Sequence, residues 1–408
     1  MKMNITNKQN DSTAKLFGAT FFFSGAHGGI FTLALPFVIT ALGGSDKDLG
    51  LCFGLGMAGY LVSCLSAAGH LDKFNAKRTL QFSSAGITAS VVLICIITGF
   101  FPSGVFSVNP IVLVTVLNIT LSVLLAMFWP PMMGWVSIGH EGLDLSKRLA
   151  GYNVTWSLSL VVAPVAAGFL TEINPSIAVS AAAICMATAF VLISSAHKPE
   201  HHKQAAETVC RAKEIEKTIP LHSAFVYMSR IGLAVGCLVI GLARTQFALL
   251  FTEDLGYDKS QFGIITMVLC SANFAGFYLT GKIKSWHHKI APFIASHILL
   301  AAGMTIIIFC GSLAMIFAAF IMIGLGQSFT YASHQYYGVS GKAKRSGSMA
   351  IHEMLISLGY AAGSIAGGYL GECSRYWPYR MGLGVTAAAI TIELIIYQHQ
   401  RMRISTKY

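Results

Sequence analysis

The stretch that decides the fold is LHSAFVYMSRIGLAVGCLVIGLARTQFALLF, residues 221–251. About 20 apolar residues are enough to cross the hydrocarbon core of a bilayer, so this stretch predicts a transmembrane helix. Arg244 lies about two helical turns before its end. A charge inside such a helix costs at least ~2.5 kcal/mol and usually marks a pathway or a binding site. Arg244 is therefore the first candidate for a functional residue.

The composition of the whole chain is that of a polytopic membrane protein. Of its 408 residues, 54% are hydrophobic and only 11% are charged, whereas soluble domains contain about 25% charged residues. The nine cysteines are scattered singly with no CxxC spacing, which indicates neither a disulfide framework nor a zinc site. We therefore expect no metal and no cofactor.

Apolar segments long enough to cross a bilayer recur along the chain. They are too long for membrane strands and lack the alternation that strands require. The sequence thus predicts an all-α polytopic membrane protein with twelve transmembrane helices, at residues 16–42, 49–69, 78–101, 110–139, 149–171, 176–196, 221–251, 260–281, 289–310, 312–338, 347–371 and 381–398.

The basic residues indicate the orientation of these helices. If the N-terminus is inside, the outer loops contain only Lys47, Lys259, Arg375 and Arg380, and most of the 28 lysines and arginines fall on the inner side. Lysine and arginine favour cytoplasmic loops, so both termini and the polar segment 197–219 are expected in the cytoplasm. The net charge of +11 is then a topology signal, and we expect no nucleic-acid partner.

The two halves of the chain repeat each other. AGYNVTWSLSLVVAPVAAGFLTE at 150–172 matches AIHEMLISLGYAAGSIAGGYLGE at 350–372, and both segments have the same expected direction across the membrane. This predicts a parallel repeat of six helices plus six. The expected domains are an N-terminal half at 1–196, a cytoplasmic linker at 197–219 and a C-terminal half at 220–408.

The loop after the second span, GHLDKFNAKR at 69–78, has an acidic residue followed by basic ones. With this loop and the six-plus-six layout, the chain resembles the major facilitator superfamily over essentially its whole length. The resemblance implies two halves that rock around a mid-membrane site, and a gating role for Asp72 and Lys73. Lys77 and Arg78 complete the loop signature. The arginine that many proton-coupled members carry in the fourth span is absent here.

The resemblance also implies that the first, fourth, seventh and tenth spans line a central cavity. Polar or aromatic side chains recur in these spans at helical spacing, and Phe31 is the repeat counterpart of Arg244. The candidate substrate-binding residues are Arg244, His27, Phe31, Asn118, Trp129, Gln327, Tyr331 and His334.

Several of these residues also have a purely structural interpretation. Arg244 could pair with a carboxylate on another helix, but the candidates Glu353 and Glu393 are expected nearer the cytoplasmic end, which favours an anionic substrate group. Glu353 is therefore placed with the gate. His27 could carry a proton or simply support helix packing, and Trp129 could stack on a substrate or belong to the core.

Taken together, these features favour a secondary active transporter of a small organic solute, anionic or amphipathic. We expect an integral protein of the plasma (bacterial inner) membrane that works as a monomer in the lipid bilayer, with H⁺ or Na⁺ as a coupled ion. A membrane-embedded enzyme is one alternative, but no nucleophile, base or metal cluster is evident. A transporter-like sensor that moves nothing is another.

Overall fold

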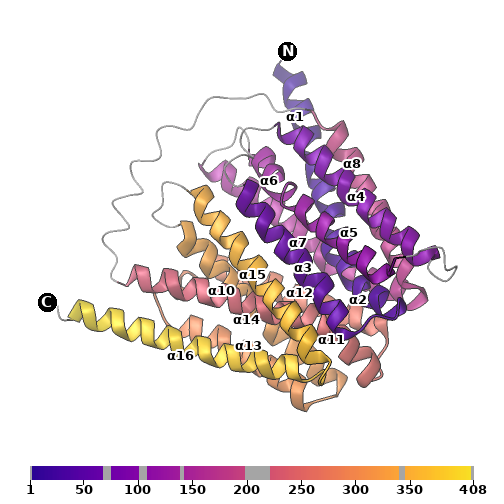
Figure 1. The fold of residues 1–408 in the computed structure, drawn as a ribbon. Coiled ribbons are helices and arrows are strands. Elements are labelled where there is room, and N and C mark those ends of the chain that lie inside the picture. Colours follow the sequence, from indigo (N-terminus) through magenta and orange to yellow (C-terminus); the bar gives the residue numbers. More distant parts are fainter. Residues whose placement is uncertain are drawn as a thin grey trace. The chain divides into compact units, whose positions relative to one another are not determined.

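The structure is a computed structural model of the chain, and it is helical throughout the part that it describes. It describes residues 2–67, 75–100, 108–137, 142–197, 221–339 and 345–405. Within these ranges the regular elements are α-, π- and 3-10 helices, with no strand (Figure 1). The all-α prediction is confirmed for this part of the chain. Most of the expected linker, and the gate candidates Asp72 and Lys73, lie outside it.

The chain forms two compact units, which we describe separately. The first comprises Met1–Lys203 and Phe251–Met267, and the second comprises Gln204–Leu250 and Val268–Tyr408. The units are thus not simply successive halves of the chain, because Phe251–Met267 groups with the first unit.

The first unit contains the helices that precede the linker. In order they are α1 (Lys2–Ser24), η1 (Gly25–Phe31), α2 (Thr32–Ala41), α3 (Asp46–Ala67), α4 (Ala76–Phe100), α5 (Pro110–Leu125), α6 (Trp129–Ser137), α7 (Gly142–Ile173) and α8 (Pro175–Ser195). Asn109 and Asn174 cap α5 and α8, because their side chains accept hydrogen bonds from backbone N–H groups of the first turn. A proline follows each cap, at a position where its missing N–H costs nothing.

Two predicted spans of this unit are interrupted helices. The first span changes from α-helix to the π-helix η1 and back to α-helix, and η1 contains His27. The fourth span stops after Leu125 and restarts at Trp129. Pro130 and Pro131 explain the restart, since proline has no N–H to continue the preceding helix.

The second unit is built mainly from the helices that follow the linker. They are α10 (His222–Arg244), α11 (Gln246–Leu249), η4 (Leu250–Asp254), α12 (Lys259–Lys282), η5 (Lys284–Trp286), α13 (Ala291–Phe309), α14 (Leu313–Val339), α15 (Arg345–Gly371) and α16 (Trp377–Ser405). The unit boundaries place η4 from Phe251 onward, and the start of α12, in the first unit. α10 packs against α13, α14, α15 and α16, so it lies among the other helices of its unit.

The seventh predicted span differs from the expected continuous helix. α10 ends at Arg244, and Thr245 has φ −107° and ψ −69°, outside the usual helical geometry. The Thr245 hydroxyl donates a hydrogen bond of 2.8 Å to the Gly241 carbonyl oxygen, a back-bond that often bends helices. Arg244 therefore lies directly at a helix break.

Eleven of the described helices, some of them interrupted, are long and apolar enough to cross a membrane. They coincide with eleven of the twelve predicted spans. The remaining one corresponds to α15, which is not among the eleven although it has 27 residues, a length of about 40 Å. The structure thus supports an integral multi-pass membrane protein.

Close approach of α10 and α15 depends on two glycines of α15. A Cβ atom at Gly359 would collide with Cys237 on α10, and one at Gly363 would collide with the Leu238 backbone. Small residues four apart are a common means of bringing membrane helices together. Tyr360 lies between these glycines and is thereby held close to the end of α10.

Candidate functional site

Arg244 is the last residue of α10 and is half-buried within the second unit. Its Nη2 lies 4.0 Å from the Cys270 Sγ of α12. The Tyr360 hydroxyl of α15 accepts a hydrogen bond from the same guanidinium. Side chains from two other helices therefore fix the direction of the charge. Neither of these two partners is a carboxylate.

Glu353 lies on the same helix as Tyr360, seven residues or about two turns earlier. It is half-buried and close enough to Cys237 of α10 to interact with it electrostatically. Its gating role, predicted from a position near the cytoplasmic end, stays a prediction. The structure places it along the α10–α15 contact that also contains Arg244.

The tenth-span candidates lie on α14 and contact α15 and α12. The Nδ1 atoms of His334 and His352 are 2.9 Å apart, and both side chains are buried. At this distance only one of the two atoms can carry the shared proton. The half-buried Tyr331 ring meets the His352 ring edge to face, with centroids 4.6 Å apart. His352 is thus a member of this cluster that the sequence did not single out.

Gln327 occupies a buried position one turn before Tyr331 on α14. Its Oε1 accepts a short hydrogen bond from Asn273 Nδ2 on α12. This pair of amides joins two helices of the second unit. Three predicted residues, Gln327, Tyr331 and His334, therefore follow one face of α14 and meet polar partners there.

In the first unit, His27 and Phe31 belong to a column of aromatic rings. The His27 ring is stacked between Phe23 and Phe31, with centroids 6.4 Å from each. Phe23 in turn stacks on Phe128 at 3.6 Å and meets Trp129 edge to face at 5.7 Å. The structure brings together three of the four predicted residues of the first and fourth spans, namely His27, Phe31 and Trp129.

Asn118 is placed differently from the other fourth-span candidate. It is buried, and its Nδ2 donates a hydrogen bond of 2.9 Å to the Cys52 carbonyl oxygen of α3. Its amide therefore supports the contact between α5 and α3. The structure does not bring it to the aromatic column that contains Trp129.

Two members of the predicted gate are described at the start of α4. The Lys77 Nζ donates a hydrogen bond of 2.7 Å to the Ala196 carbonyl oxygen at the end of α8. Arg78 is exposed, and the Asn75 side chain accepts hydrogen bonds from the backbone N–H groups of Lys77 and Arg78. Asn75 therefore acts as the helix cap that begins α4.

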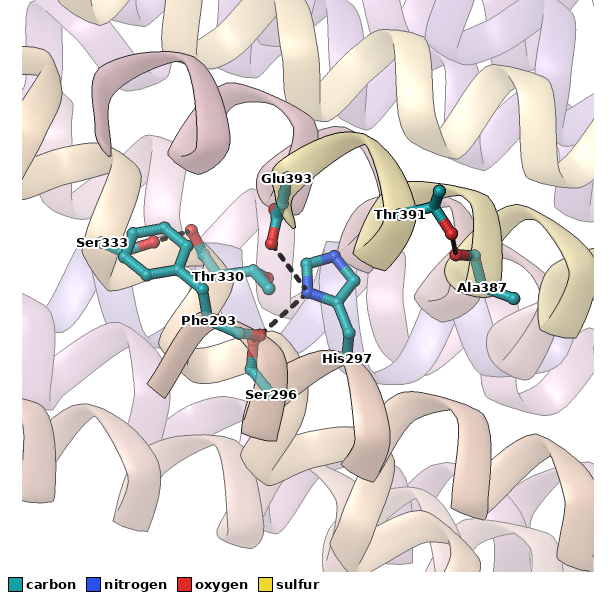
Figure 2. A network of polar contacts seen from close by, with 8 residues as sticks. All are labelled: Phe293, Ser296, His297, Thr330, Ser333, Ala387, Thr391 and Glu393. Atoms are coloured by element: carbon teal, nitrogen blue, oxygen red, sulfur yellow. Dashed lines mark hydrogen bonds and ion pairs between the residues drawn. The ribbon is translucent and has the colours of Figure 1, made fainter. Parts of the chain in front are cut away.

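A further pair of ionisable residues lies between α13 and α16. His297 and Glu393 are both fully buried, with the imidazole Nδ1 3.6 Å from the carboxylate Oε2. Figure 2 shows the His297 ring directed at both Glu393 and the Phe293 carbonyl oxygen, which lies 2.9 Å from Nδ1. His297 was not among the sequence candidates, and Glu393 was considered only as a partner for Arg244. The available signal was the general one that ionisable residues inside a span are rarely incidental.

Fold and site together define a multi-pass membrane protein with several ionisable side chains buried in its spans. A model of the Major Facilitator Superfamily matches residues 16–340. The chain belongs to this superfamily, and it is a membrane transporter by fold and family. No curated protein sequence matches the chain significantly.

Solved structures of transporters have the same fold at low sequence identity. A bacterial homologue of the human lysosomal transporter Spinster, inward-facing and unoccupied, has 14% identity and a TM-score of 0.66, covering 97% of this chain and 96% of that one. The nucleoside transporter NupG has 11% identity and a TM-score of 0.70, with coverages of 95% and 98%. A POT family transporter in complex with 5-aminolevulinic acid has 13% identity and a TM-score of 0.71, with 96% of both chains covered.

Proposed function

We propose that this protein is a secondary active transporter of a small organic solute and that Arg244 binds an anionic or polar group of that solute. The observation that carries the proposal is the setting of the guanidinium. It is half-buried at a helix break and is oriented by Tyr360 and Cys270. The two partners come from α15 and α12, so the packing of three helices determines the direction of the guanidinium.

The proposed mechanism is alternating access by rocking of two six-helix halves around a mid-membrane site. In this proposal α15 also crosses the membrane, which brings the number of spans to twelve, and the repeat of 150–172 in 350–372 relates the two halves. Both termini lie in the cytoplasm, and the protein works as a monomer in the plasma membrane. Helix breaks at η1 and after Arg244 support the proposal, because interrupted helices often form substrate sites in transporters.

The proposed solute is a small organic anion or an amphipathic compound. The similar solved structures include a nucleoside transporter and a POT family transporter bound to 5-aminolevulinic acid, so likeness of fold does not select a substrate. The side chains of this chain favour a solute with a charged end and an unsaturated or apolar part. Arg244 suits the first, and the half-buried ring of Tyr331 in the same unit suits the second.

Thermal stabilisation of the purified protein tests this proposal without assuming a substrate. A solute that binds only the folded protein stabilises it by RT ln(1 + [L]/Kd). We expect anionic members of a metabolite panel to raise the melting temperature, and the best of them to enter proteoliposomes that contain the protein. If solutes bind but none crosses the membrane, the protein is a sensor. If a bound solute is chemically converted, it is an enzyme.

A further inference from the structure

The His297–Glu393 pair includes none of the proposed solute contacts and has no assigned role. α13 contributes His297 and α16 contributes Glu393, and both side chains are inaccessible to solvent. Among the described residues, both Glu393 oxygens and the His297 Nε2 have no hydrogen-bond partner. Such groups are costly to bury, and each unpaired one calls for an explanation.

The hydrogen-bond geometry fixes one proton of the pair and leaves one to be bound. Because the Phe293 carbonyl oxygen lies 2.9 Å from the His297 Nδ1, that nitrogen carries a proton and donates it. A second proton can reside on a Glu393 oxygen or on the His297 Nε2, and in either arrangement the pair has no net charge. Loss of this proton leaves a carboxylate anion in a dry environment, which is strongly unfavourable.

Among the described residues, the side chains that line the pair carry no charge that would balance that anion. Thr330 and Ser333 of α14 lie nearby (Figure 2), and their hydroxyls already donate to backbone carbonyls of their own helix. A Cβ atom at Gly232 of α10 would lie 3.5 Å from the His297 ring. Because this residue is glycine, α10 has no side chain next to the ring at this position. Ser296 of α13 also lies near the pair, and its hydroxyl donates a hydrogen bond to a backbone carbonyl.

We find no positive charge for the Glu393 carboxylate among the ionisable side chains discussed next, which lie on α10, α14 and α16. Tyr397 of α16 lies one turn after Glu393, and it contacts the same Phe225 ring as Tyr337 of α14. Phenols are neutral at neutral pH. Arg230 of α10 lies two residues before Gly232 and so faces away from it. Its guanidinium lies over the Tyr227 ring, 5.6 Å from the centroid.

We propose that the His297–Glu393 pair is a proton-binding site of the transport cycle and that H⁺ is the coupled ion. The protonated pair is uncharged and compatible with tight packing of α13 against α16. Release of the proton requires water at Glu393, and therefore a conformation in which this packing opens. Proton release and conformational change are linked in this way. The coupling rests on the proposed transport function, whereas the proton site can be tested without it.

The proton itself is the probe in the first experiment. Infrared spectra of the full-length protein in lipid detect the carbonyl stretch of a protonated carboxylic acid. We expect a band that disappears in alkaline buffer, shifts in D₂O, is lost in Glu393→Gln and persists in Glu353→Gln. Glu353 is the matched control because it is another carboxylate on a described helix of the same unit. Glu393→Asp, which should shift the band and not abolish it, serves if the glutamine variant does not fold.

Three results would overturn the assignment. A band that persists in Glu393→Gln would belong to another residue. A band that is unchanged by alkaline buffer and by D₂O would indicate a carboxylic acid that never exchanges its proton with solvent and has only a structural role. Loss of the band in sodium chloride but not in choline chloride would make the site one for Na⁺.

A second experiment tests the coupling. A pH-sensitive dye trapped in proteoliposomes reports proton movement when a solute that stabilises the protein is added. We expect acidification with the wild-type protein and none with Glu393→Gln. Solute entry without proton movement in the wild type would overturn the coupling and leave the transporter intact. If no solute enters at all, the transport proposal fails, while the infrared result still decides the proton site.

Discussion

Arg244 receives contacts from Cys270 on α12 and Tyr360 on α15, so three helices of one unit determine where its charge points. In the sequence, Arg244 stood out as a charged residue inside a long apolar segment, and that position suggested a function. The structure adds the helix break at Thr245. A guanidinium at such a break can combine its own donors with backbone groups that the interrupted helix leaves available.

Replacing Arg244 with alanine should weaken solute binding by roughly tenfold to a hundredfold, since a hydrogen bond to a charged group contributes about 1.5–3 kcal/mol. Arg244→Lys should recover part of the affinity, because lysine keeps the charge but lacks the planar fork. The measurement is the shift in melting temperature with a stabilising solute. Arg230→Ala, in the same helix, is the control and should retain the shift. Equal shifts in Arg244→Ala and wild type would exclude a direct contact.

His288 offers a pH test outside the membrane-spanning segments. Burial, with neighbouring His222 and His287, lowers the pKa of His288 from its usual 6.5. The unfolded chain therefore binds this proton more readily, and stability is lost as pH falls below the unfolded value. His288→Asn should flatten that acid-side loss of melting temperature. Asparagine tolerates the positive φ of 55° at this position. An unchanged acid slope would count against this assignment.

The contact between α10 and α15 depends on the absence of side chains at Gly359 and Gly363. Because Tyr360 lies between them, the same contact that joins the helices also positions the partner of Arg244. Packing and the proposed binding site are therefore linked through one stretch of α15.

Gly359→Ala should destabilise the protein by about 1–3 kcal/mol, the usual cost of overpacking. The added methyl group meets the α10 backbone, which cannot move aside as a side-chain end can. Gly384→Ala on α16 is the matched control, because a Cβ atom there has no neighbour within 4 Å. Melting temperatures of the two purified variants give the comparison. If both fall equally, the α10–α15 approach is not the cause.

Elements with a strong local signal were predictable from the sequence, and their interruptions were not. The apolar length of 221–251 predicted a span correctly, but the break at Thr245 depends on which carbonyl its hydroxyl binds. The π-helix around His27 likewise has no simple sequence signal. Pro130 and Pro131 are the exception, since a missing N–H can be read directly from the sequence.

Side-chain pairs far apart in the chain were the least predictable. His334 was singled out by its spacing with Gln327, but its partner His352 comes from another helix. His297 and Glu393 belong to separate spans, and only the packing of α13 against α16 brings them together. Their positions relative to one another depend on helix rotation, which the apolar pattern of a buried membrane helix does not fix.

The orientation of the whole molecule can be tested through its own cysteines. Cys373 is exposed in the segment between α15 and α16, which is expected to face outward. A membrane-impermeant maleimide should label it in intact cells, and Cys373→Ser should abolish that labelling. Cys210, in the expected cytoplasmic linker, should react only after permeabilisation. Labelling of Cys210 alone in intact cells would invert the proposed topology.

The most direct test of the central claim is solute flux in proteoliposomes. The solute is the anionic compound that most stabilises the purified protein, and wild type is compared with Arg244→Ala and Arg230→Ala. We predict time-dependent accumulation with wild type and Arg230→Ala, and at least about a tenfold lower initial rate with Arg244→Ala, following the loss of a charged hydrogen bond. Equal rates for wild type and Arg244→Ala, or no flux above empty liposomes for any protein, would contradict it.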